Sequence, residues 1–170
     1  MKYHRIYIMG TMGSGKTTLA KKLSEKLGIK HYDLDDVVWI KKFSKKRAKK
    51  KRYKKFKEIV DKKKWIIEGV HNNWTEYAFK KVELLIWLDL NPHNVASQLI
   101  KRYIIGLIKR NERGEFKTQW SAVKYAYKYR KDSNKGKFHK LMIEKYKPNL
   151  VHIKTRRQLG EFVEGSSELK

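Results

Sequence analysis

The sequence predicts an α/β fold in which a parallel β-sheet is covered by helices on both faces. Short apolar runs, each long enough for one strand, alternate along the chain with segments of helical spacing, which is the pattern of a parallel sheet. A length of 170 residues fits one domain with a single core. We therefore expect one domain over residues 1–170.

Five apolar runs are the expected strands. The fourth is apolar throughout, as a central strand buried on both sides should be. In chain order the runs are His4–Met9, Lys30–Leu34, Trp65–Ile67, Leu84–Leu88 and Leu150–Ile153. Between the first two runs, Leu19, Leu23 and Leu27 recur every fourth residue until Gly28, which predicts a helix that ends there.

Three further segments favour helix. Thr155 followed by Gln158 is a possible capping box at the start of the last helix. A very basic stretch predicts a helix from about Lys46 to Asp61, because Phe56, Ile59 and Val60 form one apolar stripe. Residues 94–147 have a helical pattern that is broken near 111–114 and again at 133–136.

Charge is the unusual feature of the composition. The chain has 43 Lys+Arg against 17 Asp+Glu, a formal net charge of +26. Such a field attracts nucleotides, nucleic acids and anionic membranes alike, and a solvated lysine-rich surface is the plainer interpretation. The chain has no cysteine, which excludes disulfides, and no apolar run long enough to span a membrane. Met1–Met9 is too short and polar for the apolar core of a signal peptide, so we expect a cytoplasmic location.

The strongest motif is a glycine-rich loop at the end of the first run. Residues 10–17 match the pattern G-x-x-x-x-G-K-[ST] at every fixed position, which is that of a P-loop. Its glycines let successive N–H groups point at phosphate oxygens, its lysine reaches the β- and γ-phosphates, and the following hydroxyl ligates Mg²⁺. The expected nucleotide-binding residues are Gly10, Thr11, Met12, Gly13, Ser14, Gly15, Lys16, Thr17 and Thr18.

Carboxylates follow three of the expected strands. Phosphoryl transfer needs one near the magnesium ion, and often a second that orients the attacking hydroxyl. The carboxyl ends of parallel strands form the ligand crevice of such sheets, and these ends carry Asp33–Asp36, Glu68 and Asp89. For Asp33, Asp36 and Asp89 the alternative is that they begin the next helix.

The chain resembles the adenylate-kinase-like P-loop kinases, and within them the small DNA-topology-modulation kinases. The matching segments span nearly the whole chain. They are Gly10–Thr18, Leu34-Asp35-x-x-x-Trp39, Trp65–Gly69, Leu85–Leu90, Arg102 and Lys154–Arg157. The resemblance implies a three-layer P-loop NTPase fold, whose five-stranded parallel sheet has the order 2-3-1-4-5 and whose basic helical insertions close over the donor and the acceptor.

The resemblance also assigns roles to residues. It implies an acceptor-side insertion at about residues 41–61 and a lid at about residues 103–131, with Arg102, Arg110 or Arg113 on phosphates. Lys16, Asp35, Arg102 and Glu68 would be the catalytic group, with Asp35 facing the acceptor. Thr17, Glu68 and Asp89 would serve Mg²⁺, and Arg156 would contact the nucleotide.

Two departures concern the substrate. Adenylate kinases follow their acid-glycine pair with an arginine that holds the acceptor phosphate, whereas here the chain continues Val70-His71-Asn72-Asn73. The position of their base-stacking arginine holds Gln98, for which Arg156 or a lid aromatic could substitute. His71 is a candidate acceptor contact or an ordinary loop histidine.

The sequence therefore predicts an ATP- and Mg²⁺-dependent kinase that acts on a nucleotide, nucleoside or other small hydroxyl acceptor, as a monomer or homodimer. The alternative is a nucleic-acid-associated ATP-binding protein, either a polynucleotide-end kinase or a switch. The basic run within Lys41–Lys57 and the rings and cations of Trp120–Lys131 are the features that favour it, although such rings more often pack against a neighbouring helix. A GTPase switch is disfavoured because the chain has no Asn-Lys-x-Asp motif.

Overall fold

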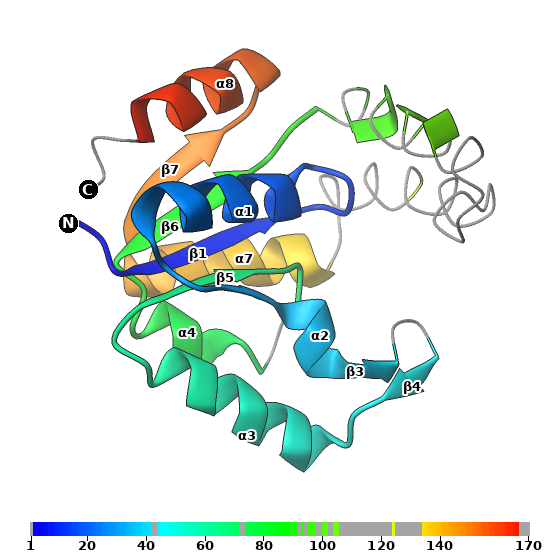
Figure 1. Cartoon of the computed structure of the whole chain (residues 1–170), viewed down its shortest axis with the longest axis vertical. Helices are drawn as coiled ribbons and strands as arrows, with labels where there is room; N and C mark the ends of the chain where they lie inside the picture. Colours follow the sequence, from blue (N-terminus) through cyan, green and yellow to red (C-terminus); the bar gives the residue numbers. More distant parts are fainter. Residues whose placement is uncertain are drawn as a thin grey trace.

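A five-stranded parallel sheet forms the centre of the protein (Figure 1). The computed structural model describes residues 2–41, 44–71, 74–91, 93, 95–97, 100–101, 104–105, 124 and 134–166. The strands are β1 (Arg5–Gly10), β2 (His31–Asp33), β5 (Trp65–Glu68), β6 (Leu84–Leu88) and β7 (Asn149–Ile153). They lie in the order β2-β5-β1-β6-β7, which is 2-3-1-4-5 counted along the chain and confirms the expected sheet.

Residues of β1 alternate between two cores, one on each face of the sheet. Ile6 and Ile8 join the first core, whereas Tyr7 and Met9 join the second. All four side chains are fully buried, as expected for a central strand with period-two alternation. The sheet is therefore covered on both faces, and the fold has three layers.

Helices complete the outer layers (Figure 1). The first core is covered by α1 (Lys16–Leu27) and α8 (Arg156–Gly165), and the second by α2 (Leu34–Val38), α3 (Lys49–Val60), α4 (Glu76–Phe79) and α7 (Asn134–Tyr146). The capping box at the start of α8 is confirmed, because Thr155 and Gln158 exchange the two expected hydrogen bonds. The helix α7 begins inside the span 133–136, where the sequence predicted a break.

The basic segment differs from its prediction at one end. The expected helix starting near Lys46 begins instead at Lys49. A two-stranded antiparallel hairpin precedes it, formed by β3 (Trp39–Lys41) and β4 (Lys45–Lys46). The hairpin is favoured because the Lys46 ammonium lies 5.1 Å from the centre of the Trp39 ring, a cation–π contact that pairs the two strands.

Several predictions fall outside the described residues. They concern the lid, its arginines and the aromatic stretch, namely Arg102, Arg110, Arg113, Gln98 and all of residues 106–123 and 125–133. These assignments stay predictions. Among the residues that are described, no helix is long and apolar enough to cross a membrane.

Candidate active site

The glycine loop connects the end of β1 to the start of α1. Gly10 has a φ of +149°, and a Cβ atom there would lie 2.5 Å from the carbonyl oxygen of Leu88. Gly15 has a φ of +93° immediately before the helix. Only glycine adopts these angles at low cost, so the loop backbone is held in the curved form that presents N–H groups to an anion.

Polar groups of the loop are buried without satisfying one another. The Lys16 side chain is only 8% exposed, and its Nζ donates a hydrogen bond of 2.8 Å to the carbonyl oxygen of Thr11. The hydroxyl groups of Thr11 and Ser14 are buried and have no hydrogen-bond partner among the described residues. Such groups cost free energy unless a partner satisfies them. A buried ammonium and two unsatisfied hydroxyls therefore fit a bound polyphosphate.

The two expected magnesium ligands nearest the loop are in direct contact. The Thr17 hydroxyl donates a hydrogen bond of 2.6 Å to Oε1 of Glu68, at the end of β5. The Glu68 side chain is buried, and burial raises the pKa of its carboxyl group, while the charge of Lys16 acts in the opposite direction. Hydroxyl and carboxylate oxygens are the donor types that Mg²⁺ prefers, so this pair fits the ion.

A histidine that the sequence did not single out lies beside this pair. His31 begins β2, and its Nε2 is 4.0 Å from Oε1 of Glu68 without a hydrogen-bond partner among the described residues. Burial lowers the pKa of His31, and the charge of Asp33 opposes that shift. The parallel register sets Asp33 beside Glu68 on the neighbouring strand and His31 beside Ile66, two residues before Glu68.

Two acids at the end of β2 have different roles: Asp33 caps a helix, whereas Asp35 contacts the loop after β5. The Asp33 side chain accepts a hydrogen bond of 2.8 Å from the backbone N–H of Asp35, so it caps α2, as the alternative interpretation held. The Asp35 carboxylate instead extends toward the loop after β5. Its Oδ1 lies 3.0 Å from Nε2 of His71, and its side chain is 39% exposed. The structure thus joins two residues that the sequence named separately as facing the acceptor.

Aromatic and basic side chains surround His71 and Trp74 next to the contact between His71 and Asp35. The ring of His71 lies 5.5 Å from that of Trp74, which packs edge-on against Phe56 of α3. The Arg52 guanidinium lies over the same Trp74 ring, 5.8 Å from its centre. The Nε of Arg52 is buried and has no hydrogen-bond partner within the described residues. The sequence did not identify Arg52 because eleven other basic residues surround it between Lys41 and Lys57.

The Asp89 side chain lies next to a histidine of β7. Its Oδ2 lies 3.2 Å from Nε2 of His152 on β7, which is an edge strand, whereas β5 lies between β2 and β1. The alternative in which Asp89 begins the next helix stays a prediction; nearby, the backbone N–H of His93 donates a hydrogen bond of 3.1 Å to the side chain of Asn91. A magnesium role for Asp89 stays a prediction.

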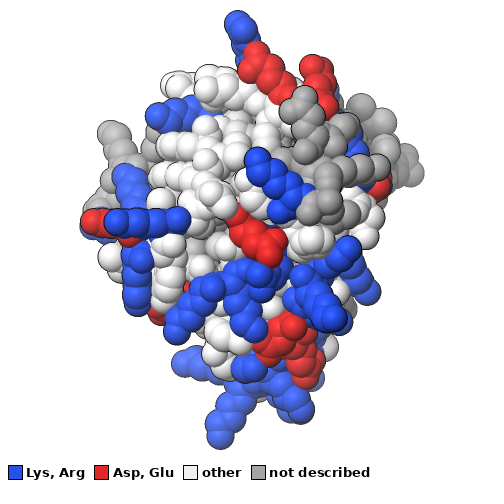
Figure 2. All heavy atoms as spheres, turned by 90° about the vertical axis from the view of Figure 1, so that its left-hand side faces the viewer, with Lys and Arg blue, Asp and Glu red and all other residues white. Residues whose placement is uncertain are grey.

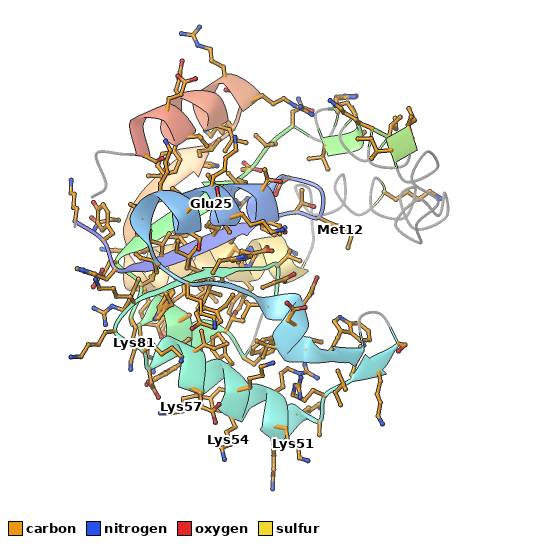
Figure 3. The ribbon with its side chains drawn as sticks, in the orientation of Figure 1. Met12, Glu25, Lys51, Lys54, Lys57 and Lys81 are labelled. Carbon is orange, nitrogen blue, oxygen red and sulfur yellow. The ribbon has the colours of Figure 1, made fainter. Side chains whose placement is uncertain are left out.

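A pocket of about 300 Å³ opens beside the loop and the start of α1. Its apolar walls come from α1, from α8 and from the segment near residue 105. The lining residues are Gly15, Thr18, Leu19, Lys22, Lys101, Ile105, Leu159 and Val163. Arg156 lies one helical turn before Leu159 and is exposed, and its Nη2 donates a hydrogen bond of 3.0 Å to the Ser97 hydroxyl. Met12, at the tip of the loop, is 42% exposed (Figure 3).

The sheet order and the glycine loop between β1 and α1 define a protein with the fold of P-loop kinases. The chain belongs to the AAA domain family, because the family model AAA_18 matches residues 6–117.

Solved structures share this fold at low sequence identity. The shikimate kinase from Acinetobacter baumannii in complex with shikimate has a TM-score of 0.57 and 16% identity, with 99% of this chain and 96% of that chain covered. The shikimate kinase from Bacteroides thetaiotaomicron has a TM-score of 0.58 and 19% identity, covering 98% and 97%. A gluconokinase from Sinorhizobium meliloti 1021 has a TM-score of 0.59 and 11% identity, covering 99% and 91%.

One curated relative is similar in sequence. It is the uncharacterized protein YqaC of Bacillus subtilis (strain 168), which is 34% identical over 103 residues. The aligned segment spans 58% of this chain and 58% of that protein.

Proposed function

We propose that the chain is an ATP-dependent kinase of the adenylate-kinase-like type, which transfers the γ-phosphoryl group of ATP to a hydroxyl group of a small acceptor. One observation carries the proposal. The glycine loop, Glu68 and Asp35 follow the ends of β1, β5 and β2, three strands that are neighbours in the sheet. A phosphate-binding loop beside two carboxylates is the arrangement that phosphoryl transfer needs.

The donor side follows from the loop. Backbone N–H groups of residues 10–18 and the Lys16 ammonium bind the phosphates, and the pocket at Leu159 takes the base, since Gly15 and Thr18 belong to both. Thr17 and Glu68 hold Mg²⁺, which when bound neutralises charge on the β- and γ-phosphates. Arg102 and Arg156 are assigned to the nucleotide on the resemblance alone. So is the division into an acceptor-side insertion (41–61) and a lid (103–131).

The acceptor side follows from Asp35 and Arg52. The partly exposed Asp35 carboxylate accepts the proton of the attacking hydroxyl. The buried, unpaired Nε–H of Arg52 favours an acceptor that carries a carboxylate or phosphate group, because a guanidinium binds these ions through two N–H groups. The acceptor is thus a small hydroxyl compound with an acidic group.

The test is an assay of phosphate transfer from ATP in the presence of Mg²⁺, with the products detected by mass spectrometry. The panel of acceptors contains nucleosides, nucleoside monophosphates, sugars, oligonucleotides, shikimate and other hydroxy acids. We expect a gain of one phosphoryl group on a hydroxy acid or a monophosphate. Lys16→Ala is the negative control for each positive member. If ATP binds and no member gains phosphate, the kinase proposal is wrong.

The basic face of α3 favours a second function, in which the same ATP site serves a nucleic-acid-bound protein. Lys and Arg side chains gather over the lower half of the face in Figure 2, and Lys51, Lys54 and Lys57 project from α3 away from the sheet in Figure 3. If this face has a specific role, an oligonucleotide should bind above about 0.2 M salt and ATP should change its affinity. Binding that disappears at that salt concentration and ignores ATP is non-specific.

A further inference from the structure

We infer that His71 is a positioning residue that fixes the Asp35 carboxylate for proton abstraction, so that the pair acts as one unit. The inference rests on the proposed kinase function. It starts from the 3.0 Å contact between Nε2 of His71 and Oδ1 of Asp35. These two residues are 36 positions apart in the chain, and they follow the neighbouring strands β2 and β5.

The direction of this hydrogen bond follows from chemistry. An ionised carboxylate only accepts, so Nε2 of His71 must carry the proton. Donation to Oδ1 stops the carboxylate from rotating about its last torsion angle. The Asp35 side chain nevertheless stays 39% exposed, whereas that of His71 is 17% exposed. The carboxylate is therefore accessible to a substrate, whereas the imidazole is mostly buried.

Buried groups fix His71 independently of Asp35. Its carbonyl oxygen accepts a hydrogen bond of 3.2 Å from the Thr75 hydroxyl and lies 3.4 Å from Nε2 of His139 on α7. Thr75 and His139 are both fully buried. The His71 ring also lies against Trp74. The imidazole is thus held by the second core, which is what a positioning residue requires.

Stability alone does not explain the pair. A hydrogen bond to a carboxylate that is 39% exposed contributes about 1 kcal/mol to folding. A fixed carboxylate is worth more in catalysis, because general-base groups contribute about 10²–10⁴-fold when they are correctly oriented.

The reaction step balances as follows. The acceptor oxygen forms a bond to the γ-phosphorus, and the bond from that phosphorus to the β–γ bridging oxygen breaks. The acceptor proton passes to Asp35, ADP leaves with the bond's electron pair, and Asp35 later releases the proton to water. His71 keeps its proton throughout and donates the same hydrogen bond before and after transfer.

The experiment is a double-mutant cycle, measured with the panel member that has the highest kcat/KM. His71→Ala should lower kcat about 10–100-fold, within the range of a displaced general base, and leave the KM for ATP unchanged. His71→Gln, whose amide N–H can reach Asp35, should restore kcat to within about threefold of wild type. In an Asp35→Asn background, His71→Ala should lower kcat no further, since coupled residues are not additive. His4→Ala is the control for loss of an imidazole elsewhere.

Several outcomes would overturn the inference. An equal loss from His71→Ala in both backgrounds would show that His71 does not act through Asp35, and a change in KM alone would make it a binding residue. If His71→Ala does not fold, His71→Gln and the ring ¹⁵N spectrum still decide: a proton found on Nδ1 rather than Nε2 contradicts the geometry. Wild-type protein that phosphorylates no panel member contradicts the kinase proposal itself, and the inference with it.

Discussion

The Thr17 hydroxyl donates a hydrogen bond of 2.6 Å to Oε1 of Glu68, which joins the first turn of α1 to the end of β5. These residues are 51 positions apart in the chain. The contact brings a hydroxyl and a buried carboxylate to one point, and the charge of Lys16 opposes the rise in the pKa of Glu68 that burial causes. The point lies where the proposed γ-phosphate and magnesium ion meet.

Glu68→Gln tests the cost of keeping this carboxylate buried. Burial raises the pKa of Glu68, so the folded protein binds its proton more tightly than the unfolded chain does. The stabilising effect is therefore fully present below the ordinary glutamate pKa and is lost as pH rises through the raised pKa. We expect the variant to gain stability relative to wild type as the pH rises above the ordinary glutamate pKa of about 4.3, as measured by urea unfolding at several pH values.

The same variant should lose activity, because the neutral amide is a poor magnesium ligand. A fall of about 10²–10³-fold in kcat is expected, the range seen when one electrostatic contact to a transition state is removed. A variant that is more stable at pH 7 but inactive would identify Glu68 as a functional group maintained against stability. Full activity would exclude it from the magnesium site.

Lys16→Ala tests the donor side. The Nζ of Lys16 donates a hydrogen bond to the carbonyl oxygen of Thr11 within the same loop, so we expect the fold to survive and the thermal midpoint to change little. Transfer should fall by about 10²–10³-fold or more, since the charge on the phosphates loses its closest cation. Lys21→Ala, an exposed lysine of α1, is the control for loss of one charge. Comparable activity in the two variants would contradict the mechanism.

Gly69→Ala tests the link between β5 and Asp35. A Cβ atom at residue 69 would lie 2.8 Å from Cβ of Leu34, which is fully buried and precedes Asp35. We expect a loss of about 1–3 kcal/mol in the free energy of unfolding from overpacking. The displaced Leu34 should also lower kcat. Gly160→Ala is the matched control, because its Cβ meets nothing within 4 Å inside α8, and it should stabilise by about 0.5–1 kcal/mol.

Local features of the fold could be predicted from the sequence, because each is written in neighbouring residues. The loop Gly10–Thr17, the five apolar runs and the capping box of Thr155 with Gln158 are all of this kind. The strand order required the resemblance, since nothing in the apolar runs says which strand pairs with which.

The contacts that shape the site could not be predicted in the same way. His71 with Asp35, and His31 with Glu68, are pairs brought together by the sheet across dozens of residues. Isolated histidines carry no local signal of such a partner. The hairpin of β3 and β4 was also missed, because a run of lysines has no strand pattern, and its pairing depends on Trp39.

Leu159→Ala tests the assignment of the pocket to the nucleotide base. The side chain lines the pocket of about 300 Å³ beside Gly15 and Thr18. Removing its outer carbons should cost about 1 kcal/mol of apolar contact and raise the KM for ATP about fivefold, with kcat and the KM for the acceptor unchanged. Leu141→Ala, at an exposed leucine of α7, should change none of these constants. An unchanged KM for ATP in Leu159→Ala would place the base elsewhere.

Arg52→Gln tests the acidic class of the acceptor. A charged hydrogen bond contributes about 1.5–3 kcal/mol, so the KM for an acidic acceptor should rise about 10–100-fold while that for ATP stays constant. Lys54→Gln removes the same charge from the same helix, but its side chain is exposed and points away from the sheet (Figure 3), so it should leave both constants unchanged. An equal rise in the KM for the acceptor in the two variants would mean that the summed positive charge of α3, rather than Arg52 itself, attracts the acceptor. Preferential loss in Arg52→Gln, confined to acidic members of the panel, would instead identify its guanidinium as the group that selects the substrate.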